Sequence, residues 1–459
     1  MSKASKIILS IVGLGVLAFG GLKLAEYKAE EILRAENDRI IKISKEEGID
    51  LAFGDVSVNL LTQTMTADGI TLFQADDDLK MDISVGKVTA SGFDIVQVFQ
   101  APDAFDADLV EIAEIKAILD GKDKDGKPTQ VIFTVENAKI TGSNLGSLNP
   151  ELEKIDDLDA QQTVELLKKI KIDQVVLNNM SAQAKEIDFK FNTLTFNDIF
   201  SGTLRDFKIA GGTVLKDAKE VITLNDITYK SDKFIKDVAT QASLEMNAFN
   251  LIIPEKDAPE KLVAFKELTG LDEFSLNSRF AVNFDMNKKT FNYEDIMIEL
   301  KDAWKLNLAA SIGNIPELEE IERLQEIVMF YEQGDDIPPD FMAFLQELSF
   351  NSLSINIEDK SLISKMLEAR AKEKNTSKQM LAMGFAMVAQ QQLEPITGPE
   401  IASQISSNFS EILQNGGSFG LNLQTKEGET LKIMEAAALA MMMPQELAAR
   451  LDISSSYTK

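Results

Sequence analysis

The chain has 459 residues, with 47 Lys and Arg against 74 Asp and Glu, and it contains no histidine and no cysteine. These two absences exclude Ser-His-Asp and Cys-His nucleophilic sites, Cys/His zinc sites, histidine-ligated haem and disulfides. The formal net charge of −27 disfavours nucleic-acid binding, which needs a basic surface to release phosphate counterions. We therefore predict a protein that is not an enzyme and has no cofactor or metal site. A hydrolase that uses two carboxylates is the enzymatic alternative.

The first 25 residues have the pattern of a transmembrane signal anchor. A short basic start precedes the uncharged residues 7–22, and if Lys23 extends its charge to the interface, the stretch 4–25 provides the roughly 20 residues that a spanning helix needs. A cleaved signal peptide is the alternative, but no small-x-small cleavage motif follows, and residues 27–43 continue in a helical pattern. The apolar residues of the predicted anchor are Ile7, Ile8, Leu9, Ile11, Val12, Leu14, Val16, Leu17, Phe19 and Leu22.

Charge is distributed unevenly along the chain. Residues 1–47 hold 8 Lys and Arg and 7 Asp and Glu, a net +1, so the total of −27 leaves −28 for the remainder. Basic residues flank the apolar run almost equally on both sides, which gives only a weak preference for an N-terminus in the cytoplasm. We predict that residues 26–47 form a helical stalk. The acidic remainder should be repelled by anionic lipid and stand away from the bilayer.

From residue 48 onward, apolar residues alternate with polar ones. This period of two is typical of strands with one apolar and one solvated face, so residues 48–315 are predicted to form a β-rich region of antiparallel sheet. Alternating runs flank Asp68-Gly69, and Asp-Gly in that context is a strong signal for a hairpin turn. Further alternating runs occupy residues 132–140, 187–196, 204–209, 221–229, 242–251, 274–286, 290–300, 304–308, 348–357 and 418–423.

Stretches with helical periodicity interrupt and follow these strands. Within the β-rich region we predict helices at 106–119 and 151–170. Residues 316–347 are predicted to be a helical insertion, and residues 348–459 to contain strands and helices that complete the β domain. The fold class is α+β: an N-terminal transmembrane helix and stalk, then a large, mainly antiparallel, curved sheet with helical insertions and C-terminal helices. The later predicted helices occupy residues 316–331, 339–348, 361–374, 377–393, 398–414 and 433–451.

The aromatic composition favours apolar contacts, because the chain has 26 Phe but only 5 Tyr and 1 Trp. Phe has no polar group and suits interior packing or an apolar ligand, whereas sugar platforms favour Trp and Tyr. A curved sheet with one continuous Phe-rich face could hold acyl chains, and methionines along one side of a helix suit variable apolar ligands. Packing in a closed core is the alternative for every such residue. The candidate groove residues are Val56, Val58, Met65, Ile70, Phe189, Phe191, Phe280, Phe284, Phe350, Met380, Met383 and Met387.

Residues 54–72 combine a strand, a corner at Leu60-Leu61-Thr62 and a returning strand, after the predicted anchor and stalk. This arrangement resembles the start of AsmA-like envelope proteins of Gram-negative bacteria. Residues 348–357, the predicted helices through residue 393, the run 419–425 and the final helix are similar to the YdgA-like branch of that group. The resemblance implies an inner-membrane anchor, a periplasmic β-rich domain, a link to phospholipid traffic and outer-membrane homeostasis, and no catalytic residues. The chain is far shorter than the members that bridge two membranes.

Two functional hypotheses follow. The first is a non-enzymatic protein, anchored in the inner membrane by a single span with its bulk in the periplasm, which binds phospholipid or another acyl-chain ligand and serves envelope lipid homeostasis or transport. The second is a structural or scaffolding protein of the cell envelope that has a closed core and binds partner proteins. The two differ in whether the apolar strand faces close on one another or leave a groove open.

Overall fold

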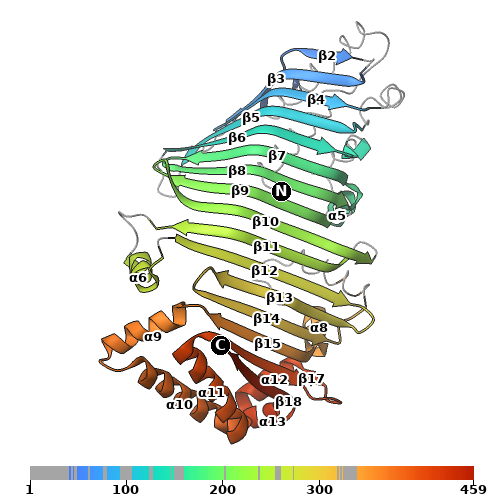
Figure 1. Ribbon diagram of the computed structural model, residues 1–459. Helices are drawn as coiled ribbons and strands as arrows, with labels where there is room; N and C mark the ends of the chain where they lie inside the picture. The colour runs from blue at the N-terminus through green and yellow to red at the C-terminus, as the bar shows by residue number, and fades with distance from the viewer. Residues whose placement is uncertain are drawn as a thin grey trace. The chain divides into compact units, whose positions relative to one another are not determined.

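The computed structural model divides the chain into two compact units, residues 1–229 and 230–459, which we call the N-terminal unit and the C-terminal unit (Figure 1). The predicted anchor (1–25) and almost all of the predicted stalk (26–47) lie outside the described residues. No helix within the described part of the chain is long and apolar enough to cross a membrane. The described residues are 41–42, 45, 49–59, 62–75, 80–93, 106–122, 128–145, 147–148, 160–200, 203–235, 238–253, 260–271, 273–317, 320, 323 and 339–459.

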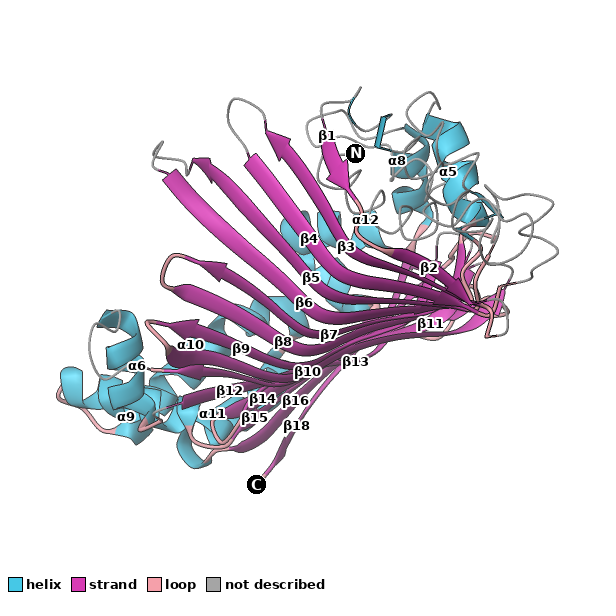
Figure 2. Cartoon of the chain, turned by 90° about the horizontal axis from the view of Figure 1, so that it is seen from above, coloured by secondary structure: helices cyan, strands magenta, loops and turns pink. Residues whose placement is uncertain are grey.

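The N-terminal unit is a curved antiparallel sheet (Figure 2). Its first two strands both pair with β3, and from β3 to β9 each strand pairs with the next in chain order. The division between the units falls inside β10 (Lys219–Ile235). The other elements of this unit are β1 (Ile49–Ala52), β2 (Val56–Asn59), β3 (Thr64–Ala75), β4 (Lys80–Ser91), β5 (Leu109–Lys122), β6 (Pro128–Thr141), α5 (Ala160–Lys169), β7 (Lys171–Ala184), β8 (Ile187–Phe200) and β9 (Thr203–Lys216).

Two lines of interrupted pairing, which we call creases, cross the strands of this unit. In β3 the buried residues change phase from Met65 and Ala67 to Ile70 and Leu72 at Gly69, which has a φ of +60°. The facing positions on β4 to β9 also drop out of the strand pairing, and φ is positive at Glu114, Asn179 and Gly211. The first crease comprises Gly69, Gly86, Glu114, Glu136, Asn179, Asn192 and Gly211. The second lies six residues away: it passes just outside the ends of β3 to β6, at Gln63, Gly92, Asp108 and Gly142, and interrupts β7 to β9 at Asp173, Asp198 and Arg205.

The creases let a strand change phase and keep its apolar side chains on one face. A shift of one residue normally sends every following side chain to the other face of a sheet. At the crease each strand contains one extra, unpaired residue, as in a β-bulge. The extra residues of neighbouring strands face one another. The pairing register is therefore the same on both sides of the crease, for example Met180 with Phe191 and Asn178 with Thr193.

The creases also explain two wrong predictions. Asp68-Gly69 is not a hairpin turn, because β3 runs through it; the hairpin lies between β2 and β3, where the Thr62 N–H donates to Asn59 Oδ1 at 3.1 Å. Residues 106–119 are not a helix but the start and most of β5. The phase change at Glu114 places apolar residues at 110, 112, 115 and 119, a spacing that imitates helical periodicity.

The C-terminal unit is also built on antiparallel pairing. Strands β11 to β15 pair in chain order, β15 pairs with both β16 and β17, and β16 pairs with β18. The elements are β11 (Val238–Ile252), α6 (Glu260–Thr269), β12 (Glu273–Asp285), β13 (Thr290–Leu300), β14 (Trp304–Gly313), α8 (Pro339–Glu347), β15 (Ser349–Asp359), α9 (Leu362–Glu373), α10 (Lys378–Thr397), α11 (Pro399–Asn415), β16 (Gly417–Thr425), β17 (Leu431–Lys432), α12 (Ile433–Met442), α13 (Pro444–Ala449) and β18 (Leu451–Thr458).

The predicted α+β character is confirmed for the described residues: mainly antiparallel, curved β-structure with C-terminal helices. The helices predicted at 339–348, 361–374, 377–393 and 398–414 are present as α8 to α11. The single helix predicted at 433–451 is wrong. It is broken at Met443, because proline at position 444 disfavours helical backbone at the residue before it; the short helix α13 follows, and Leu451 already begins β18. Residues 151–159 and most of 316–331 lie outside the described part.

Replacing a crease glycine should weaken the N-terminal unit. Gly211 has a φ of +66°, and a Cβ there would overlap the side chain of Asn192. We expect Gly211→Ala to lower the free energy of unfolding by about 1–3 kcal/mol, measured by thermal unfolding. The control is Gly384→Ala in α10, where a Cβ meets nothing within 4 Å and the change should stabilise the helix by up to about 1 kcal/mol. A neutral Gly211→Ala would contradict the constraint on the crease.

The polar face of the C-terminal unit is held by hydrogen-bonded rows of side chains. Glu299 accepts from Lys360 Nζ at 2.6 Å and from Asn277 Nδ2 at 3.1 Å. The hydrogen bond from Lys360, followed by the one from Asn277, lowers the pKa of Glu299 below its ordinary value. The same bond with Glu299 raises the pKa of Lys360.

These two shifts define a window of pH in which the pair stabilises the fold. The contribution of Glu299 is present above its unfolded pKa of 4.5 and is lost as the pH falls through its lowered folded pKa. The contribution of Lys360 is present below 10.5 and is lost as the pH rises through its raised folded pKa. We expect Glu299→Gln to cost about 1 kcal/mol or less at pH 7 in urea unfolding, and nothing once the pH is below the lowered pKa. Glu273→Gln, at the exposed start of β12, should cost little at either pH, and a pH-independent loss for Glu299→Gln would contradict the assignment.

Candidate functional site

One face of the C-terminal unit carries apolar side chains in rows that cross neighbouring strands. We call this surface the apolar face of the C-terminal unit. In the central row, each residue faces the next across a strand boundary: Leu244, Phe280, Ile296, Leu308, Ile355 and Leu421. A second row contains Met246, Ser278, Ile298, Leu306, Ile357, Phe419 and Tyr457, and a third contains Phe284, Phe291, Ile312, Phe350 and Leu431.

Helices cover one end of this face. α11 packs against β16 and β18, and Phe409 meets Phe419 in an edge-to-face contact with ring centroids 6.1 Å apart. Phe419 is therefore only 8% exposed. At the end of the third row, Phe350 packs against the buried Leu431 and Leu439 beneath α12. The C-terminal helices thus close the apolar face over β15 to β18.

The other end of the face is open. Leu244 on β11 is 39% exposed and Phe280 on β12 is 40% exposed, although they face each other in the central row. Ile296 and Leu308, the next residues in that row, are half-buried. Contiguous apolar surface exposed to water is unfavourable and commonly marks a binding site. The rows therefore run from a covered end to an open end.

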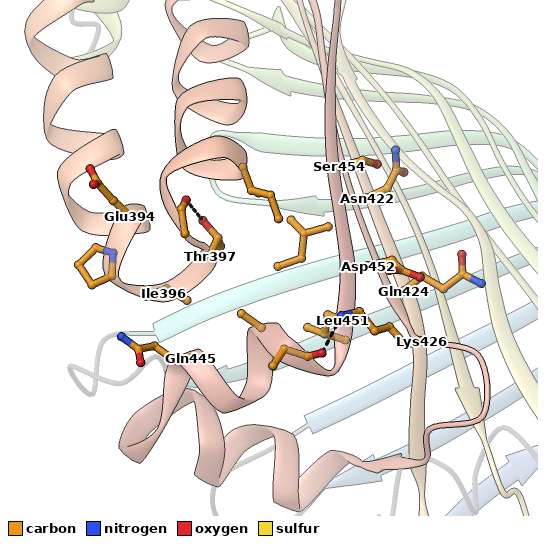
Figure 3. A pocket seen from close by; sticks show the side chains of 16 residues that line it. Glu394, Ile396, Thr397, Asn422, Gln424, Lys426, Gln445, Leu451, Asp452 and Ser454 are labelled. Carbon is orange, nitrogen blue, oxygen red and sulfur yellow. Dashed lines mark hydrogen bonds between the residues drawn. The ribbon is translucent and has the colours of Figure 1, made fainter.

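A pocket of about 660 Å³ lies beside the covered end, between the end of α10, α13 and β18 (Figure 3). Its apolar lining includes Ile396 and Leu451, and its two carboxylates, Glu394 and Asp452, come from different walls. Lys426 Nζ donates to the Ala449 carbonyl at 2.8 Å. In the described residues no group of three or more acidic residues is arranged to hold a metal ion. The lining is therefore mixed, with apolar and charged side chains.

The structure separates the candidate groove residues into three sets. Met65 and Ile70 are buried in the core of the N-terminal unit, and Val56 and Val58 pack against that core. Phe189, Phe191, Phe280, Phe284 and Phe350 lie on sheet faces; of these, Phe189 and Phe280 are exposed. Met380, Met383 and Met387 are not on a strand but lie exposed on α10.

Several residues of the open rows are missing from the predicted set, notably Leu244, Ile296 and Leu308. They occupy the same alternating positions of β11, β13 and β14 as Phe280 does in β12. The signal that could have found them is therefore the strand pattern itself, read for Leu and Ile as well as for Phe.

A buried carboxylate joins the sheet to the helices that cover it. Asp359, at the end of β15, is 4% exposed and accepts the backbone N–H groups of Ile363 at 2.8 Å and Ser364 at 3.1 Å. These are orphan donors of the first turn of α9, where a negative charge also interacts favourably with the helix dipole. Ser361, the predicted helix start, instead donates its hydroxyl to the Asp302 carbonyl.

Loss of this carboxylate should loosen the helical cover. We expect Asp359→Ala to lower the free energy of unfolding by about 1–3 kcal/mol, because two buried N–H groups lose their acceptor. Asp359→Asn keeps one acceptor oxygen and should lose less. Chemical denaturation followed by circular dichroism measures both variants. Equal losses for the two variants would contradict the capping role.

The comparisons with known proteins cover part of this unit. A family model described as "Uncharacterized protein" matches residues 297–457, from within β13 to β18. No curated protein matches the chain. The matched segment contains the covered end of the apolar face together with α8 to α13. The match assigns no activity to it.

Proposed function

We propose that the protein is a non-enzymatic, membrane-anchored protein of the bacterial envelope whose apolar face in the C-terminal unit binds an acyl chain, as part of lipid homeostasis or transport. The observation that carries the proposal is the central row, in which Leu244 and Phe280 are exposed at one end while helices cover the other. The polar face of the same strands bears hydrogen-bonded Asn, Ser and charged side chains. Only one face of the sheet therefore needs an apolar partner.

The dimensions of the row suit an acyl chain. Strands lie about 4.8 Å apart, so the four strands from β11 to β14 span roughly 14 Å. The acyl chains of one leaflet span about half of the roughly 30 Å hydrocarbon core. An acyl chain that lies across the strands would contact Leu244, Phe280, Ile296 and Leu308 in turn. Its flexibility suits a surface of Phe, Leu and Ile without fixed polar contacts.

Location at the inner membrane, with the bulk of the chain in the periplasm, rests on the sequence. The uncharged stretch 7–22, the helical pattern that follows it and the resemblance to AsmA-like and YdgA-like proteins support this part of the proposal. An anchored protein would sample lipid from its own membrane. A bound lipid with its chain on the sheet could then be passed to a partner.

The second candidate is a scaffold that binds partner proteins. It is favoured by β18, which among the described strands pairs with β16 alone. A sheet edge of this kind can accept an extended peptide as an added strand. The pocket beside β18 is lined by four consecutive residues of that strand, Leu451 to Ser454. Crosslinking that captures proteins but never lipid would favour this candidate.

A photoactivatable phospholipid with a diazirine in its acyl chain tests the first candidate. The full chain is placed in nanodiscs that contain this lipid, and labelled peptides are identified by mass spectrometry. We expect label on peptides from β11 and β12, in addition to the predicted anchor, which serves as an internal standard. Leu244→Ser with Phe280→Ser should reduce the β-strand label at least about tenfold relative to the anchor label, because each large apolar side chain contributes roughly 1.5–3 kcal/mol when buried.

The matched control is Met297→Ser. Met297 faces Arg279 on the polar side of the same strands, so its loss changes an apolar residue without changing the apolar face. This variant should be labelled like the unmodified protein. Absence of label on β11 and β12, or equal loss in the control, would contradict acyl-chain binding on this face.

A further inference from the structure

α10 has an inverted distribution of side-chain size. Its small residues face the protein: Ala382 is fully buried, in contact with the cluster that contains Leu367 of α9 and Leu413 of α11. Leu381 and Leu393 also pack inward, but five large apolar residues face outward, with Met380 63% exposed and Met387 62% exposed. A helix that packs only against its own protein normally buries its large apolar residues. The outer face is completed by Met383, Phe385 and Val388, and we call these five residues the methionine face.

The helical hairpin of α9 and α10 is basic in a protein that is acidic overall. Residues 362–397 contain five Lys and Arg and three Glu, a net +2, while the whole chain carries −27. No charged residue occurs between Lys378 and Glu394. Lys372 and Lys374 are exposed at the turn between the helices, and neither forms an ion pair with another described residue.

The methionine face begins at this basic turn. Thr376 lies in the turn, and its hydroxyl contacts Met380 Sδ at 3.7 Å. Met380, Met383 and Met387 follow at the spacing of one helix face, so the apolar stripe extends along α10 from the lysines. α10 packs against α9 and α11, which lie beside it (Figure 1). The backbone of α10 is thus held in place by its neighbours, while its unbranched methionine side chains can adapt to a partner. Positive charge lies at one end of this surface.

We infer that the methionine face and the basic turn dock on the surface of a bilayer that contains anionic phospholipid. An interfacial helix has this pattern: its apolar side chains enter the boundary of the acyl chains, and its lysines remain at the lipid headgroups. Methionine is unbranched and polarisable, and it adapts to a fluid environment that offers no fixed pockets. The basic turn gives this surface a local charge opposite to that of the acidic chain as a whole, so charge complementarity favours an anionic bilayer over a neutral one at this position. This surface is separate from the acyl-chain site on the sheet and does not depend on it.

The absence of cysteine permits a direct test in the full chain. Met383→Cys, labelled with an environment-sensitive fluorophore, reports on the methionine face, and Ser407→Cys, exposed on α11, is the control position. The protein is held in phosphatidylcholine nanodiscs, which accommodate the predicted anchor. Separate vesicles with nitroxide-labelled acyl chains are added, made of phosphatidylglycerol and phosphatidylcholine or of phosphatidylcholine alone. We expect a blue shift and quenching at position 383 with the anionic vesicles only, and neither at position 407.

Charge substitutions test the basic turn. Lys372→Gln with Lys374→Gln should reduce the ratio of docked to free protein roughly 30-fold, as expected for two lysines near an anionic surface. Lys216→Gln with Lys219→Gln, at the turn between β9 and β10, removes the same charge elsewhere and should leave the ratio unchanged. Absence of quenching at position 383, or equal quenching at position 407, overturns the inference. A blue shift that grows with protein concentration without vesicles also overturns it and indicates contact between copies of the chain.

Discussion

The alternation of side chains along a β-strand is the constraint on which the rest of the structure depends. Each strand must place its apolar residues on one face, and an unmatched shift of one residue would place half of them in water. In the N-terminal unit, the strands β3 to β9 change phase at facing positions of the first crease, where β3, β5, β7 and β9 each have a residue with positive φ. Because neighbouring strands change phase together, the apolar face stays continuous and the core around Met65 and Val88 is closed.

The same constraint makes the C-terminal unit one-sided. Asn, Ser and charged side chains occupy the face opposite the apolar rows, as in the bonds of Asn277 and Lys360 to Glu299. Helices α11 and α12 close part of the apolar face, and Gln404 and Asn408 of α11 bond to Ser455 of β18 and fix the cover to the edge strand. At the other end of the central row, Leu244 and Phe280 stay exposed and Ile296 and Leu308 are half-buried. The exposed part of this face is therefore the part that the C-terminal helices do not reach.

Side-chain size on α10 follows from the position of that helix in the cover. Close packing against α9 and α11 requires small residues such as Ala382 and Ala386 on the inner side. The five residues of the methionine face are then left on the outer side, where they are exposed in the described part of the chain. Two apolar surfaces of different kinds thus occur in the C-terminal unit: a rigid one on strands, rich in Phe, Leu and Ile, and an adaptable one on a helix, rich in Met.

The sequence by itself determined the antiparallel, one-sided character of the strands and the positions of α8 to α11, because alternation and helical periodicity are local properties. It failed at Asp68-Gly69 and at residues 106–119, where a crease shifts the phase and the local pattern imitates a turn or a helix. It also gave Met65 and Phe280 the same status, since both are apolar residues of alternating strands. Only the tertiary structure separated them, burying Met65 completely and leaving Phe280 40% exposed. Which part of an apolar face is covered depends on elements distant in the chain, as with α11 over β16 and β18, and a local pattern carries no record of that packing.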